Sequence, residues 1–219
     1  MQSTLIRKYL MAATGLFLSL FLVIHLAGNL QLLLPPERSA IQFNEYSRIL
    51  SSNLIIKAVS YLLFASLLLH SIYAVVITRY NQKSSGGKYE VDHRGGRSKW
   101  YSRNMGILGS LILIFLVVHL KDYWYVYSFG EPPLDANGNK DLFTIVVASY
   151  GELWYVAFNL IAFIALGYHM LHGVFSAFKT FGAYPSVLNK LLYRIGIGFS
   201  LIMTLGFIII PIYVYLNYH

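Results

Sequence analysis

The sequence predicts an all-α integral membrane protein, with five transmembrane helices in a single membrane domain that spans residues 1–219. Of the 219 residues, 57% are apolar and only 12% are charged, more apolar surface than a soluble domain of this length needs to bury. The apolar residues gather in stretches that each reach the roughly 20 residues needed to cross a bilayer. These stretches are residues 9–34, 58–78, 104–127, 153–178 and 195–216.

The first stretch follows Arg7 and Lys8, as the apolar part of a signal peptide would. It is too long for that role and has no convincing small-residue cleavage site, so we expect it to remain as an anchor. Most of the 17 lysines and arginines flank the stretches on the side of the N-terminus, including a long loop at residues 79–103. By the positive-inside rule, the N-terminus lies in the cytoplasm and the C-terminus outside.

The absence of cysteine excludes thiolate-bound iron–sulfur clusters, covalently attached c-type haem, disulfides and cysteine zinc sites on this chain. A redox metal would therefore have to be held by histidine. The first four stretches carry His25, His70, His119 and His169, and an ionisable residue at that depth is costly unless it has a partner. The fifth stretch has no histidine, and we expect it to be a packing helix outside the other four.

The four histidines fall at two depths. Counting from the nearest cytoplasmic-side charge places His25 and His119 about 25 Å from the inner boundary, and His70 and His169 about 14 Å from it. We call His70 and His169 the inner pair, and His25 and His119 the outer pair. Two stacked haems, each held between two imidazoles, need this arrangement. A zinc site would need its ligands at one level, and a proton relay usually includes carboxylates, of which these stretches hold just one, Asp122 near the end of the third.

An internal repeat supports the pairing. Residues 15–26 and 109–120 share a glycine, a Phe-Leu-Val run, a histidine and a leucine in the same register. Residues 70–75 and 169–174 match more weakly, and their register selects His169 rather than His172 as the equivalent of His70. Copies in the same orientation predict a pseudo-twofold axis along the membrane normal. We expect His172 to bind a haem propionate or to pack.

Gly15 and Gly109 each precede an outer-pair histidine by ten residues, which places them near the depth of the inner pair. One hypothesis is that the missing side chains let the edge of the inner haem pass close to these helices. The alternative is that small residues allow close contact between helices.

Together these features resemble the five-helix, di-haem cytochrome b subunit that anchors succinate dehydrogenases and menaquinol:fumarate reductases. The resemblance covers essentially the whole chain. It rests on the helix count, on the four histidines, on the His25 to Asn29 spacing and on the His-x-x-polar-Gly pattern at 169–173. It implies that the inner pair ligates the haem nearer the catalytic subunits and the outer pair the distal haem. Some fumarate reductases of this family carry a glutamate where this chain has Gly167, so a proton route through that position is not expected here.

The resemblance also implies partners and a place in metabolism. A flavoprotein with covalent FAD and an iron–sulfur subunit would dock on the cytoplasmic face, in the inner membrane of a bacterium. The dicarboxylate chemistry of the respiratory chain and the tricarboxylic acid cycle would take place on those subunits. Electrons would pass from the iron–sulfur subunit to the inner haem, then to the outer haem and to a quinone, usually menaquinone, or along the same path in reverse.

Aromatic and carboxylate groups at the outer ends of the helices are candidates for a quinone site, with Glu45 the first choice for proton handling. The competing explanation for the aromatic residues is an interfacial belt. The quinone-site candidates are Glu45, Arg48, Tyr123, Trp124 and Glu152, with Tyr46, Tyr125 and Trp154 nearby. The candidates for haem propionates are Lys179, Arg103, Arg7 and His172 at the inner level and Arg48 at the outer, although each cation could equally be an interfacial anchor.

Two other functions remain open from the sequence. One is a cytochrome b subunit of a membrane hydrogenase or formate dehydrogenase, which would keep the two haems and change the partners. The other is a haem-free membrane anchor or transporter whose histidines only pack.

Overall fold

The computed structural model describes residues 4–84, 99–182 and 186–219. These residues form helices joined by short turns, with one isolated bridge between Leu134 and Lys140. The helices that make up the spans are α1 (Thr4–Asn29), α3 (Leu54–Ser84), α5 (Met105–His119), α8 (Leu153–Thr180) and α9 (Ser186–Tyr218). Shorter segments connect them: η1 (Leu30–Leu33), α2 (Pro36–Ser52), α4 (Trp100–Arg103), the π-helical segment η3 (Leu120–Tyr125), α6 (Val126–Phe129) and α7 (Leu142–Tyr150).

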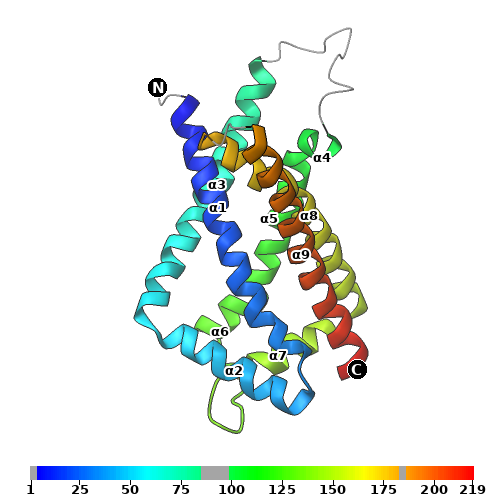
Figure 1. Ribbon diagram of the computed structural model, residues 1–219. Coiled ribbons are helices and arrows are strands. Elements are labelled where there is room, and N and C mark those ends of the chain that lie inside the picture. Colours follow the sequence, from blue (N-terminus) through cyan, green and yellow to red (C-terminus); the bar gives the residue numbers. More distant parts are fainter. Residues whose placement is uncertain (1–3, 85–98, 183–185) are drawn as a thin grey trace.

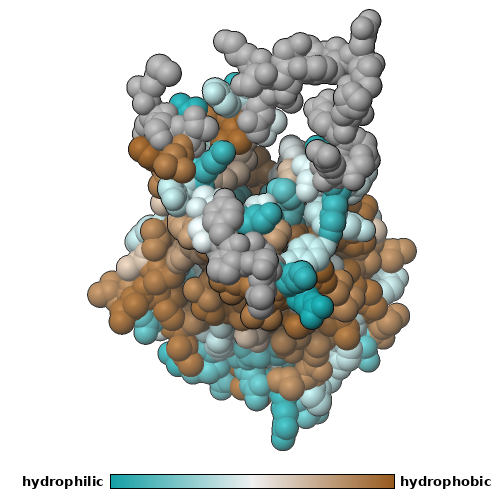
Figure 2. Space-filling model, turned by 45° about the horizontal axis from the view of Figure 1, so that its top comes forward, coloured by the Kyte–Doolittle hydropathy of each residue, from teal (hydrophilic) through white to brown (hydrophobic). Residues whose placement is uncertain are grey.

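Within the residues that the structure describes, five helical segments are long and apolar enough to cross a membrane, which confirms the predicted number. They are Leu5–Leu33, Leu54–Tyr80, Met105–Phe129, Leu153–Thr180 and Lys190–Tyr218. The chain termini lie at opposite ends of the bundle, and we call the end with the N-terminus the inner end (Figure 1). Apolar side chains form a broad band around the face drawn in Figure 2, with hydrophilic residues below it. These features define a multi-pass, all-helical membrane protein.

The tightest packing in the bundle involves α9. It runs along α8 and also contacts α1, while α5 packs on α8 and α3 on α1. A Cβ added at Gly206 of α9 would lie 2.7 Å from Leu26 Cδ2, and one added at Gly167 of α8 would collide with the Thr204 side chain. The glycines therefore allow α9 to approach both neighbours closely. A larger side chain at Gly167 would have to displace the Thr204 side chain.

Two further helices, α2 and α7, do not span the bundle but lie across its outer end (Figure 1). The sequence reading treated these residues as connections between spans. Asn44 of α2, which is 1% exposed, joins them: its Nδ2 donates to Asp141 Oδ1 at 2.9 Å, and its Oδ1 accepts from the Phe143 backbone N–H at 2.9 Å. Asn44 Nδ2 also lies 3.3 Å from Asp135 Oδ2. We call Asn44, Asp135 and Asp141 the outer latch.

Asp141 also caps the N-terminus of α7, since its carboxylate accepts from the Thr144 backbone N–H at 3.0 Å and from Thr144 Oγ1 at 2.7 Å. Burial raises the pKa of Asp141, but the hydrogen bonds from Thr144 and Asn44 lower it by more, so the pKa lies below its ordinary value. The latch therefore holds an ionised carboxylate at neutral pH.

The predicted cytoplasmic loop at residues 79–103 falls largely outside the described residues. At its two ends, α3 continues to Ser84 and α4 begins at Trp100.

Candidate functional site

The structure brings the four predicted histidines together as two pairs. The ring centres of His25 in α1 and His119 in α5 lie 5.7 Å apart, and those of His70 in α3 and His169 in α8 lie 6.1 Å apart. Each pair joins two helices that are not consecutive spans, so the meeting is a product of the tertiary fold. The two pairs lie at different levels, because the inner pair faces a turn of α1 that precedes His25 by about 15 Å of helical rise.

The spacing of each pair suits a shared metal. Two metal–nitrogen bonds of about 2 Å, with about 1 Å more from each nitrogen to the centre of its ring, place two imidazole centres about 6 Å apart. Edge-to-face packing of aromatic rings gives similar distances. Packing alone, however, leaves ring nitrogens without partners in an apolar interior, where an unmet polar atom is costly. Within the described residues, His169 Nδ1 is buried and forms no hydrogen bond, so this ring is short of partners, and a metal bound at Nε2 would give it one.

The outer pair is enclosed by aromatic rings. Phe21 stacks on His25 at 5.2 Å, and Phe115 lies at the same helical spacing before His119, with 5.3 Å between ring centres. Phe207 of α9 approaches His25 to 6.0 Å. The fifth span was expected to lie outside the histidine-bearing four, but it contributes this ring to the surroundings of the outer pair.

The inner pair lies against the two glycines of the repeat. A Cβ added at Gly15 would lie 3.2 Å from His70 Cε1, and one added at Gly109 would lie 3.8 Å from His169 Cε1. The space next to each glycine is thus taken by a histidine ring from the neighbouring helix. Both hypotheses for these glycines placed something close to the backbone, and what lies there is the imidazole itself.

His172 has separate surroundings. Its Nδ1 lies 2.7 Å from Ser102 Oγ, and its Nε2 lies 3.3 Å from Ser176 Oγ. Both ring nitrogens therefore have hydroxyl partners, which suits a histidine that ties α4 to α8. The sequence reading did not single out Ser102, because nothing in the spacing of α4 predicts that it meets α8.

Three of the cations proposed for haem propionates lie at helix ends. Lys179 is in the last turn of α8, with its ammonium 4.8 Å from the centre of the Phe175 ring. Arg103 ends α4, and Arg7 lies near the start of α1, both towards the inner end. Their role as propionate partners stays a prediction.

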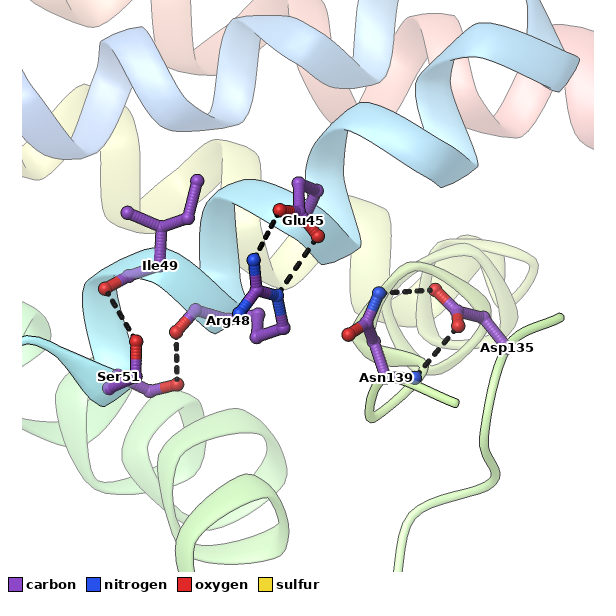
Figure 3. Close-up of polar contacts among 7 residues, drawn as sticks. Glu45, Arg48, Ile49, Ser51, Asp135 and Asn139 are labelled. Atoms are coloured by element: carbon purple, nitrogen blue, oxygen red, sulfur yellow. Dashed lines mark hydrogen bonds and ion pairs between the residues drawn. The ribbon is translucent and has the colours of Figure 1, made fainter. Parts of the chain in front are cut away.

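Two of the quinone-site candidates, Glu45 and Arg48 of α2, pair with each other. Arg48 Nη2 and Nε donate to the two Glu45 carboxylate oxygens at 2.5 and 3.0 Å (Figure 3). The hydrogen bonds from Arg48 lower the pKa of Glu45. The ion pair with Arg48 stabilises the ionised carboxylate, which has no proton to donate at pH 7. The contact argues against Glu45 as the group that protonates a quinone.

The other candidates lie in different environments. Trp124 packs on Phe64 of α3, with ring centres 4.9 Å apart, and Glu152 stands just before α8, where its backbone oxygen accepts from the Tyr155 N–H at 2.9 Å. Tyr123 is the candidate that reaches a histidine, since its ring lies 5.1 Å from that of His119.

Polar side chains of η3 and α8 lie near Tyr123, with Tyr155 and Asp122 next to it and Asn159 one helical turn beyond Tyr155. The Tyr123 hydroxyl and Asn159 Oδ1 are buried and form no hydrogen bond of normal geometry. The Tyr155 hydroxyl, which lies next to that of Tyr123, donates to Asp122 Oδ2 at 3.2 Å. Asp122 and Tyr123 belong to the π-helical segment η3, a distortion that is frequent at functional sites. The sequence reading missed Asp122, Tyr155 and Asn159.

No group of three or more His, Cys, Asp or Glu side chains gathers to hold a metal ion within residues 4–84, 99–182 and 186–219. The histidines of this part of the chain thus form pairs and not a tetrahedral set. Comparison with protein-family models, with curated proteins and with solved structures gives no match.

Proposed function

We propose that the chain is the di-haem cytochrome b membrane anchor of a succinate:quinone oxidoreductase, respiratory complex II. The observation that carries the proposal is the meeting of four histidines from four spans as two pairs at two levels. A haem b held by each pair would supply one-electron transfer. His70 and His169 would hold the inner haem, and His25 and His119 the outer one.

The surroundings of the pairs support this role. Phe21, Phe115 and Phe207 exclude water from the outer pair, and low polarity favours neutral imidazoles, the form that binds metal. The same contacts recur in both copies of the internal repeat. A phenylalanine packs on each outer histidine from four residues earlier in the chain, and the ring of each inner histidine lies against a glycine of the neighbouring helix. These matched contacts support the pseudo-twofold relation that we infer from the repeat.

The partners follow from the resemblance and from the composition. A chain without cysteine leaves the iron–sulfur clusters and the FAD to other subunits, and the basic inner end would face them from the bacterial inner membrane. The quinone, for which menaquinone is our choice, would bind near the outer pair. Among the candidates, Tyr123 fits this role best, because its ring contacts His119 and its hydroxyl has no hydrogen bond of normal geometry.

The test is the haem content of the purified complex, with the two centres resolved by spectrum and redox titration. We expect two haems b per chain, accompanied by a flavoprotein and an iron–sulfur subunit. His169→Ala should remove one haem and His119→Ala the other, because each variant breaks a different pair. His172→Ala is the matched control one helical turn from His169. Because Ser102 and Ser176 occupy both ring nitrogens of His172, this variant should retain both haems.

Several results would contradict the proposal. A complex without b-type haem would leave the histidines as packing residues of a haem-free anchor. A copurified nickel or molybdenum subunit would assign the chain to a hydrogenase or formate dehydrogenase. Loss of both haems, or of neither, in His169→Ala would disprove the pairing.

A further inference from the structure

We propose that Thr14 is a positioning residue that fixes the tautomer and orientation of His70, so that Nε2 is the atom available to bind iron. The proposal rests on the proposed function for the identity of the bound group. It assigns a role to a hydroxyl that the sequence pattern did not single out.

The contacts of Thr14 favour one direction of proton donation. Thr14 Oγ1 lies 2.8 Å from the Leu10 backbone oxygen, 3.2 Å from the Met11 backbone oxygen and 3.2 Å from His70 Nδ1. A hydroxyl has one proton to donate, and a backbone carbonyl can only accept. With the hydroxyl proton on a carbonyl, the Thr14 oxygen is free to accept from the Nδ1–H of His70, which is the direction that we infer; the Met11 carbonyl beside the ring is a second acceptor that favours a proton on the same side.

This direction fixes the chemistry of the other ring nitrogen. A neutral imidazole carries one proton, so protonation at Nδ1 leaves the lone pair on Nε2. Gly15, the next residue in α1, lies beside the same ring, with 3.2 Å between its added Cβ and His70 Cε1. Two adjacent residues thus control the ring: Gly15 gives it room, and Thr14 sets its rotation and its tautomer.

The second half of the repeat has the glycine without the hydroxyl. Gly109 lies beside His169 as Gly15 lies beside His70, but the residue before Gly109 is Leu108, a buried side chain that cannot accept a hydrogen bond. His169 Nδ1 accordingly has no partner. The inner pair is therefore asymmetric, with one imidazole supported by an acceptor and the other unsupported.

The asymmetry has an electronic consequence. A hydrogen bond donated by the non-ligating nitrogen raises the basicity of the ligating one. A more basic imidazole stabilises ferric over ferrous iron and lowers the midpoint potential of the haem. Thr14 should therefore hold the potential of the inner haem below the value that it would have with two unsupported ligands.

The experiment compares Thr14→Val, which keeps the shape and removes the hydroxyl, with Thr14→Ser, which keeps the hydroxyl. Both are measured in the full complex by redox titration and by low-spin electron paramagnetic resonance. In Thr14→Val we expect two haems per chain, an upward shift of the inner midpoint potential and an unchanged outer potential. Thr14→Ser should restore the wild-type potential. Leu108→Thr, which offers His169 an acceptor, should shift the inner potential downward.

A second measurement does not depend on haem. Nitrogen-15 spectra of histidine-labelled, haem-free chain should show His70 protonated at Nδ1, and Thr14→Val should reduce that preference. An unshifted inner potential in Thr14→Val with both haems bound, or equal shifts in the Val and Ser variants, would overturn the role of Thr14 and leave the proposed function intact. A wild-type complex without haem would instead refute the proposed function, while the nitrogen spectra would still decide the tautomer.

Discussion

Replacing Gly15 by leucine is the sharpest test of how the inner pair is built. A Cβ at this position would lie 3.2 Å from His70 Cε1 and 3.6 Å from Nδ1, whereas carbon atoms in contact prefer about 3.5–4.0 Å. An added methyl group already pushes the ring by a few tenths of an ångström. A leucine places three more carbons where the ring stands, and overpacking of this kind costs about 1–3 kcal/mol.

The expected result is loss or strong weakening of the inner haem with the outer haem retained. An energy of 1–3 kcal/mol corresponds to roughly 5- to 150-fold in binding. The assay is the haem content per chain, with a redox titration to show which centre is missing. Gly15→Ala should have a smaller effect than Gly15→Leu: the inner haem should stay bound, with an altered spectrum.

Gly109→Ala is the matched control, because its Cβ would lie 3.8 Å from His169 Cε1, an ordinary contact distance. Both alanine substitutions gain up to about 1 kcal/mol of helix propensity, so the comparison isolates the effect on the ring. If Gly15→Leu binds both haems with unchanged spectra, the glycine serves only helix contact and our account of the inner pair is wrong.

Three other predictions concern the outer end. Asn44→Leu removes the partner of the Phe143 backbone N–H, so we expect about 1–3 kcal/mol of destabilisation in detergent thermal unfolding, with no such loss in the exposed Asn217→Leu. Asp141→Asn keeps the helix cap but cannot titrate. The folded-state pKa of Asp141 is lowered, so its ionised form contributes fully to the free energy of unfolding above its ordinary pKa of 3.8. That contribution is lost as the pH falls through the folded-state pKa. The unfolding temperature of Asp141→Asn should therefore fall less on acidification than that of the wild type. Tyr123→Phe should slow quinone turnover without changing haem content, and the exposed Tyr125→Phe should not; equal turnover in both would remove Tyr123 from the quinone site.

Periodicity along one chain was enough to predict the five spans. Apolar runs of this length have few alternatives, because a backbone in lipid must satisfy its hydrogen bonds within one helix. The same reasoning could not predict α2 and α7. Their stability comes from tertiary contacts such as those of Asn44, which bonds to residues about a hundred positions later in the chain.

The histidine pairs show a similar division. The depth count predicted which histidines share a level. In the structure the ring centres of His25 and His119 lie 5.7 Å apart, and those of His70 and His169 lie 6.1 Å apart, distances that a shared metal ion would give. Whether iron lies between them stays a prediction. The surrounding residues were not foreseeable, since the approach of Phe207 to His25 depends on how α9 packs against α1.

The amino-acid sequence by itself determined the membrane class, the number of spans and the levels of the histidines, because these depend on composition and on the fixed rise of a helix. Only the tertiary structure decided which rotational face each helix turns inward. That choice sets the hydroxyl of Thr14 against His70, leaves His169 Nδ1 without a partner among the described residues and brings Phe207 of α9 to His25. Helix rotation follows from side-chain packing between spans, and the local pattern of one span does not contain it.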